Sequence, residues 1–231
     1  MSDFGEFRAR GRAALLAGEA THDVPMVEGA MRWGAAAAFR PEGEIVDRMT
    51  ELAATVDAPG HWVHGGPTLH VTLRTLEPYR THIPEDDPLR RAYGAALAEA
   101  VDGLPPAEVR LAGVSPHRGG VLVGAHPRDD TLATVRKRFA CALESRGVRD
   151  LEQGRVRDLW YVSLVHFAAP LANARDLVGW CDTHAETDFG TAELRTAEIV
   201  QFLHTGRGIR VRSLEIAALD GDGGVSPRPH S

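Results

Sequence analysis

The chain has 231 residues, 43% of them hydrophobic and 25% charged, with a formal net charge of −6 and two cysteines that lack metal-ligand spacing, Cys141 and Cys181. This composition predicts a soluble, reduced, cytoplasmic protein of one domain or two small lobes, with no membrane span and no secretory signal. The negative charge gives no overall attraction to nucleic-acid backbones, so long RNA or DNA is disfavoured as a partner.

Hydrophobic periodicity and turn residues predict strands and helices along the whole chain. In the first half we expect a helix around 7–16, a strand over 31–41, a helix over 44–56, a Gly-rich turn at 61–66, a strand over 68–76 and a helix over 84–104. In the second half we expect strands near 107–114 and 120–125 joined by a Pro-His-Arg-Gly-Gly turn, a helix over 129–145, a strand over 157–170, a helix over 171–184, and strands over 190–203 and 208–219.

This order is typical of an α+β protein whose two halves look alike, because in each half a helix leads into a hydrophobic strand of similar character. We divide the chain into an N-terminal helical extension (1–30), one bilobal domain (31–219) and a disordered tail (220–231). The tail is assigned from its Gly, Pro and Ser content, which does not support a packed core.

The strand in "TLHVTLRTLEPYR" (68–80) carries polar residues at alternating positions. Because side chains alternate across a strand, His70, Thr72 and Arg74 are expected on one face, with the intervening Val71 and Leu73 directed into the core. A strand that is apolar on one side and carries His, Thr and Arg on the other is suited to form the floor of a groove. Arg74 would then bind an anion with its planar guanidinium.

A second strand repeats this cadence in the other half of the chain. In "WYVSL" (160–164), Tyr161 and Ser163 are expected on one face, with Val162 and Leu164 on the other. Aligned with the first motif, YVSL differs from HVTL only by Tyr for His and by Ser for Thr.

With the order of elements over 31–219, these two motifs resemble the 2H phosphoesterase superfamily, which includes RNA 2′,5′-ligase-like proteins and cyclic phosphodiesterases. The resemblance implies two pseudo-symmetric lobes of antiparallel-rich sheet, with outer helices, around a central cleft. It also implies chemistry without a metal or other cofactor. One histidine acts as general base, the other protonates the leaving oxygen, and the Thr or Ser hydroxyls bind phosphoryl oxygens. On this chain the implied catalytic residues are His70 and Tyr161, and the implied substrate-binding residues are Thr72, Ser163 and Arg74.

Tyr161 stands where the superfamily has its second histidine. An imidazole, with a pKa near 6.5, serves as acid or base at neutral pH, whereas a phenol with a pKa near 10 donates a proton or hydrogen bond but is a poor base. A different histidine would have to supply the missing base. His166 is expected to face away from the groove unless a β-bulge turns it inward. His61, His64 and His204 are candidates for the groove entrance or rim.

Three functions stay open at this point. The first is a metal-independent phosphodiesterase acting on a small nucleotide or a 2′,3′-cyclic phosphate, with His70 as the acid or base. The second keeps the fold for a one-histidine isomerase, cyclase or lyase reaction on a non-phosphate metabolite, in which Tyr161 and Ser163 hold a developing oxyanion. The third is a non-catalytic binder of a nucleotide or phosphorylated ligand. The sequence does not specify the oligomeric state.

Overall fold

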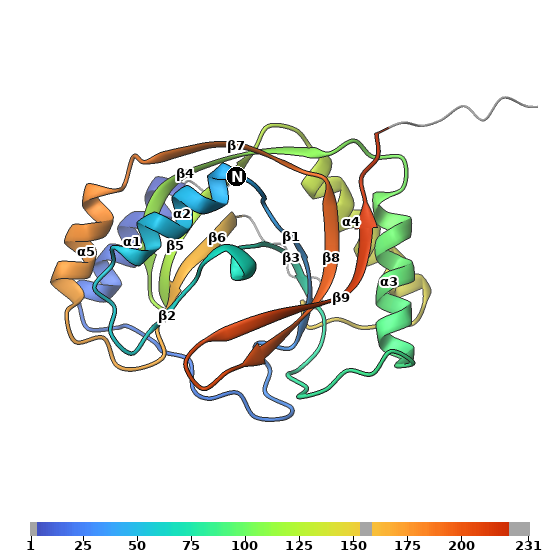
Figure 1. Cartoon of the computed structure of the whole chain (residues 1–231), viewed down its shortest axis with the longest axis horizontal. Helices are drawn as coiled ribbons and strands as arrows, with labels where there is room; N and C mark the ends of the chain where they lie inside the picture. The colour runs from blue at the N-terminus through green and yellow to red at the C-terminus, as the bar shows by residue number, and fades with distance from the viewer. Residues whose placement is uncertain (1–3, 153–158, 222–231) are drawn as a thin grey trace, which may run out of the picture.

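Figure 1 presents the computed structural model of the chain, which describes residues 4–152 and 159–221. The described residues form five α-helices, one 3₁₀ turn and an antiparallel sheet of nine strands that curls into a half-barrel. The helices are α1 (Phe4–Leu16), α2 (Glu44–Ala54), α3 (Pro88–Val101), α4 (Thr131–Ser145) and α5 (Ala174–Thr183). The strands are β1 (Ala35–Phe39), β2 (Trp62–Val63), β3 (Val71–Thr75), β4 (Ala107–His117), β5 (Gly120–Pro127), β6 (Trp160–His166), β7 (Asp188–Leu194), β8 (Thr196–His204) and β9 (Ile209–Ala218).

The sheet consists of two lobes that meet at its centre. The strand order is β7-β4-β5-β6-β3-β1-β8-β9, and β2 pairs with β6. One lobe holds β3, β1, β8 and β9, the other holds β6, β5, β4 and β7, and the lobes join where β3 pairs with β6 at Val71 and Val162. The expected α+β fold with two antiparallel lobes and outer helices is therefore confirmed.

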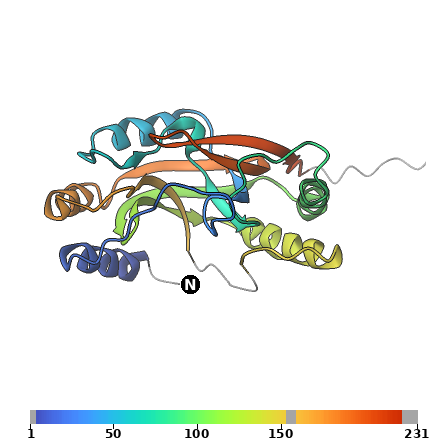
Figure 2. The same cartoon turned by 90° about the horizontal axis from the view of Figure 1, so that it is seen from below.

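The helices cover the outside of the curled sheet. Figure 2 shows α3 and α4 at one end of the molecule and α1, α2 and α5 at the other. Helix α1 contacts β4 and α5, so the N-terminal extension is packed onto the second lobe. Asp87 caps the N-terminus of α3, and its carboxylate accepts hydrogen bonds from the backbone N–H groups of Leu89 and Arg90. In the described part of the chain, no helix combines the length and apolar character needed to cross a bilayer.

Two details of the expected strands are corrected. The segment predicted as a single strand over 190–203 is two strands, β7 and β8, separated at Arg195. Since β7 pairs with β4 and β8 pairs with β1, the chain crosses here from one lobe to the other. No Gly or Pro marks this break, so the local pattern does not reveal it. The turn expected at 61–66 contains the short strand β2 and leads into the 3₁₀ turn Gly66–Thr68.

Of the tail predicted to be disordered (220–231), residues 222–231 lie outside the described residues. The last described residue, Gly221, donates its N–H to the carbonyl of Leu104 at 3.1 Å.

Candidate active site

The two motif strands meet at the centre of the sheet. Because Val71 and Val162 are register partners, the residues that flank each valine point to the opposite face of the sheet. These flanking residues line a cavity of about 610 Å³. They are the four motif residues expected from the sequence: His70, Thr72, Tyr161 and Ser163.

A bulge in β3 changes which side chain follows Thr72 on the cavity face. The ladder with β1 shifts register between Thr72 and Arg74, which leaves Leu73 as an extra residue. An extra residue reverses the alternation of the strand. Consequently Leu73 and Arg74 are both buried, and Thr75 lines the cavity beside Thr72.

The expectation that Arg74 shares a face with His70 is therefore wrong. The Arg74 guanidinium donates to the carboxylate of Asp150 at 2.5 Å, and the side chains are 9% and 7% exposed. Breaking a buried, hydrogen-bonded ion pair by removing one partner costs about 3–5 kcal/mol. In this structure Arg74 stabilises the fold around β3 and does not contact the cavity.

A matching bulge in β6 brings His166 into the site. The ladder with β5 shifts register between Ser163 and Val165, so Leu164 is the extra residue. The alternation reverses here too, and His166 lines the cavity on the same face as Tyr161 and Ser163. This is the bulged arrangement that the sequence left open as the alternative to an outward-facing histidine.

His64 lies behind His166 and holds it in place. The two rings are joined by a hydrogen bond of 2.7 Å between His64 Nε2 and His166 Nδ1, and His64 Nδ1 lies 3.2 Å from Thr68 Oγ1. Burial lowers the pKa of His64 to about 3, and burial followed by the nearby His64 holds the pKa of His166 well below its usual 6.5. Both rings are therefore neutral at physiological pH.

The other two candidate histidines lie elsewhere. His61 Nδ1 accepts a hydrogen bond from the backbone N–H of Ala168 at 3.3 Å. His204 packs against Trp62, with ring centroids 5.3 Å apart. Neither belongs to the described residues that line the cavity.

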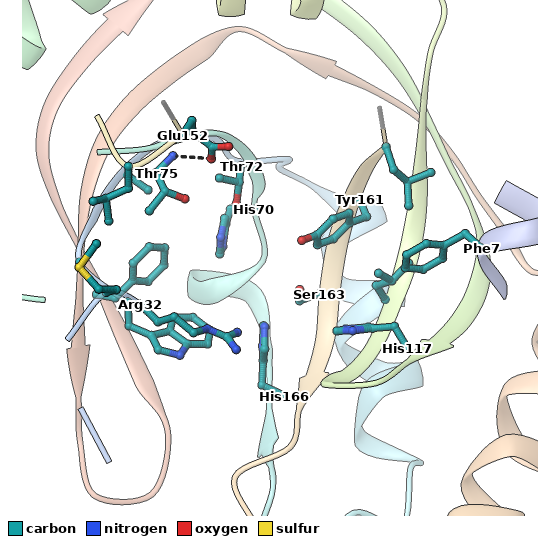
Figure 3. Close-up of a pocket in the computed structure, with 18 residues that line it drawn as sticks. Phe7, Arg32, His70, Thr72, Thr75, His117, Glu152, Tyr161, Ser163 and His166 are labelled. Carbon is teal, nitrogen blue, oxygen red and sulfur yellow. Dashed lines mark hydrogen bonds between the residues drawn. The ribbon is translucent and has the colours of Figure 1, made fainter. Parts of the chain in front are cut away.

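The His70 ring is fixed by a backbone carbonyl two residues before it. Its Nδ1–H donates to the carbonyl oxygen of Thr68 at 2.7 Å, which directs proton exchange with a ligand to Nε2. Phe202 packs on the ring with centroids 5.2 Å apart. Figure 3 shows His70 and His166 entering the cavity from opposite sides, and the Tyr161 hydroxyl directed toward His70.

His117 is a cavity residue that the sequence did not indicate. The expected Pro-His-Arg-Gly-Gly turn begins later than predicted, because β4 continues to His117. The backbone N–H of Gly119 donates to His117 Nδ1 at 3.2 Å, while Nε2 is buried and has no hydrogen-bond partner among the described residues. Burial lowers the pKa of His117 to about 4. A histidine before a Gly-Gly turn was the available signal, but it does not reveal the direction of the ring.

The remaining wall of the cavity is cationic and aromatic. Arg32, paired with Asp23 at 2.8 Å, has a side chain that is 63% exposed and extends into the cavity in Figure 3. Trp33 packs on His166 and Phe202 with centroid distances of 4.6 and 5.5 Å. Its φ of 64° is rare for a residue other than glycine, and such strain concentrates at functional sites. The lobe junction thus combines imidazoles, hydroxyls, a guanidinium and aromatic rings.

Comparison with solved structures identifies the fold. A Thermus thermophilus protein, TT0787, superposes with a TM-score of 0.61 at 17% identity, covering 82% of this chain and 99% of the other. A protein described as a phosphoesterase gives 0.55 at 14% identity over 81% and 98% of the two chains. Escherichia coli LigT in complex with 3′-AMP gives 0.55 at 14% identity, again over 81% and 98%.

The chain has the LigT-like 2H phosphoesterase fold. No protein-family model and no curated protein matches its sequence. Further LigT structures with the same fold contain NADP⁺, phosphate or ATP.

Proposed function

We propose that this protein is a phosphodiesterase that acts without a metal on a small nucleotide or a 2′,3′-cyclic phosphate, with His70 as an acid or base. The observation that carries this proposal is the convergence of His70 and Thr72 with Tyr161 and Ser163 on one cavity across the Val71–Val162 pair. Hydroxyl donors to the phosphoryl oxygens and imidazoles for proton transfer are suited to the hydrolysis of a phosphodiester.

The cavity wall supports a nucleotide as the ligand. The Arg32 guanidinium provides a cation for a phosphate oxygen, and Trp33 and Phe202 offer flat apolar surfaces on which a base can stack. LigT, which shares the fold, has been crystallised with 3′-AMP, NADP⁺ and ATP. The net charge of −6 favours such a small ligand over long RNA.

Each motif residue has a separate role in this proposal. Thr72 and Ser163 donate hydrogen bonds to the phosphoryl oxygens from the two lobes. His70 exchanges a proton at Nε2 while its Nδ1–H stays bound to Thr68. Tyr161 donates a hydrogen bond from its hydroxyl. Arg74 has no part in binding, because it is buried against Asp150.

One observation favours a second function. Because Tyr161 occupies the place of the second motif histidine, the cavity would bind a nucleotide without turning it over if no other residue supplied the second proton transfer. This non-catalytic binder differs from the phosphodiesterase in turnover and not in affinity.

The test is hydrolysis of 2′,3′-cyclic nucleotides and 2′,5′-linked dinucleotides in EDTA by wild type, His70→Gln and His82→Gln. His82 is exposed and serves as a matched control. We expect turnover by wild type and His82→Gln and a loss of about 100-fold or more in His70→Gln, the usual range for a general acid or base. Nucleotide binding without any turnover would support the binder and contradict the phosphodiesterase.

A further inference from the structure

The hydrogen bonds behind His166 fix the position of its proton. Thr68 Oγ1 lies 2.9 Å from the carbonyl oxygen of Gly65 and 3.2 Å from His64 Nδ1. A hydroxyl carries one proton, and we assign it to the shorter contact with the carbonyl oxygen. Toward His64 the Thr68 oxygen is then an acceptor, so His64 Nδ1 carries a proton and donates it.

The proton on His64 Nδ1 determines the tautomer of His166. A neutral His64 protonated on Nδ1 has its lone pair on Nε2, and it accepts from His166 Nδ1–H at 2.7 Å. His166 therefore carries its own lone pair on Nε2. Within residues 4–152 and 159–221, no hydrogen bond occupies this nitrogen, and the ring lines the cavity.

His117 has the opposite tautomer. Its Nδ1 accepts from the Gly119 N–H, so the neutral ring carries its proton on Nε2. This N–H is buried and has no partner among the described residues, although a buried donor without a partner costs about 1–3 kcal/mol. Figure 3 shows the His117 ring directed toward His166 across the cavity. An oxygen atom between the rings would accept from His117 and donate to His166.

We propose that His166, positioned by His64, is the general base that takes the place of the second motif histidine. This inference rests on the proposed phosphodiesterase function. A water molecule held by His117 gives a proton to His166 Nε2 as its oxygen bonds to phosphorus. The bond from phosphorus to one ribose oxygen breaks, and that oxygen takes a proton from Nε2 of protonated His70. The products are a phosphate monoester and a free hydroxyl, and the two histidines return to their starting states by proton exchange with solvent.

Burial keeps the free His166 ring unprotonated but also makes it a weaker base. Because burial disfavours the imidazolium, the ring keeps its lone pair available at neutral and mildly acidic pH. A bound phosphate anion next to Nε2 would stabilise the imidazolium as it forms. The titratable and charged groups that bear on this ring come from different parts of the fold, and they are His64, His70, His117 and Arg32.

The first test replaces the base and preserves the hydrogen bond behind it. In His166→Asn the side-chain amide can still donate to His64 from near the Nδ1 position, but nothing replaces Nε2. The matched control is His61→Asn, whose amide oxygen can still accept from Ala168. We expect kcat for 2′,3′-cyclic nucleotide hydrolysis to fall about 100-fold or more in His166→Asn with KM within threefold of wild type, and the control to match wild type.

The outcomes separate the two proposals. Turnover by wild type and an equal kcat in His166→Asn would overturn the role of His166 and leave the phosphodiesterase function standing. Absence of turnover in wild type would overturn both. If His166→Asn does not fold, the second test decides.

The second test addresses His64 as a positioning residue. His64→Leu removes the acceptor for His166 Nδ1–H, whereas His64→Gln offers an amide oxygen near the Nε2 position. We expect kcat to fall at least tenfold in the Leu variant and to recover to within threefold of wild type in the Gln variant, with KM unchanged in both. Equal kcat values in the two variants would overturn the proposed orientation of His166 by His64.

Discussion

Tyr161 and His166 lie on the same face of β6, although they are five positions apart in the sequence. In a regular strand they would point to opposite faces. The extra residue Leu164 reverses the alternation between them, as Leu73 does in β3. The cavity therefore receives Tyr161 from the motif position and an imidazole from beyond the bulge.

Replacement of Tyr161 by Phe tests whether the phenol transfers a proton. If Tyr161 only donates a hydrogen bond, Tyr161→Phe lowers kcat/KM by about 10- to 150-fold, since one hydrogen bond to a charged group contributes about 1.5–3 kcal/mol. Steady-state hydrolysis of a 2′,3′-cyclic nucleotide measures the effect beside His70→Gln. A loss in Tyr161→Phe well above about 150-fold, and as large as that in His70→Gln, would make the phenol an acid–base group.

Removing the motif hydroxyls should weaken phosphate binding. Thr72→Val and Ser163→Ala each remove one donor to a phosphoryl oxygen, so we expect the Kd for 3′-AMP to rise about 10-fold in each variant. Isothermal titration calorimetry provides the measurement, with the exposed Thr81→Val as control. Unchanged affinity in both cavity variants would contradict the roles given to these hydroxyls.

Gly120 permits the close approach of β5 to β6 at His166. It is the register partner of His166, and a Cβ atom at this position would overlap the carbonyl oxygen of Val165. We expect Gly120→Ala to lower the free energy of unfolding by about 2 kcal/mol or more, because the strands must separate. Gly179 is the matched control, since a Cβ there meets no atom and alanine favours the helix by about 0.5–1 kcal/mol. Urea unfolding of both variants checks this, and equal stabilities would contradict it.

The buried histidines make the fold sensitive to acid. When the pKa of a histidine is lower in the folded state, its contribution to the free energy of unfolding is complete above the unfolded pKa near 6.5 and is lost as the pH falls toward the folded pKa. The folded pKa is about 3 for His64 and about 4 for His117. Each pH unit below 6.5 then lowers the free energy of unfolding by about 1.4 kcal/mol per histidine.

Buried carboxyls act in the opposite direction, because burial raises the pKa of Asp23 and Glu77. The contribution of His64 is therefore measured as the difference between wild type and variants in how far the free energy of unfolding falls with pH. Between pH 7.5 and 5.5, we expect the free energy of unfolding measured with urea to fall by about 1 kcal/mol less in His64→Gln than in wild type. In His82→Gln it should fall by as much as in wild type. Identical losses in all three proteins would contradict a neutral, buried His64.

Regular patterning in the sequence was sufficient to predict the α+β fold and its helices. Alternation in HVTL and YVSL also placed His70, Thr72, Tyr161 and Ser163 on one face, and the structure brings them to one cavity. The misassigned residues follow the two bulges. An extra residue in a strand changes every later side chain, and nothing local in "TLRT" or "SLVH" marks it. Arg74 was therefore expected in the cavity, while Thr75 was not.

Long-range contacts account for the remaining gaps. His64 acquires its role only through β2, which pairs with the end of β6 and sets the two rings side by side. Arg32 and Trp33 lie in the segment predicted as the start of a strand over 31–41, whereas β1 begins only at Ala35. Trp33 reaches the wall through contacts with His166 of β6 and Phe202 of β8. Such contacts join residues that are distant in sequence, so a single sequence does not specify them.

The central claim is that the lobe junction is a nucleotide site whose histidines all present Nε2 to the ligand, with a lone pair on His166 Nε2 and a proton on His117 Nε2. Long-range ¹H–¹⁵N correlation spectra of the imidazoles, recorded with and without 3′-AMP, test it most directly. The account predicts Nδ1–H tautomers for His64 and His166, an Nε2–H tautomer for His117, and shifts of the His70, His117 and His166 signals on binding while His82 stays unchanged. Spectra in which 3′-AMP leaves all three cavity histidines unshifted, or in which His117 and His166 share one tautomer, would contradict it.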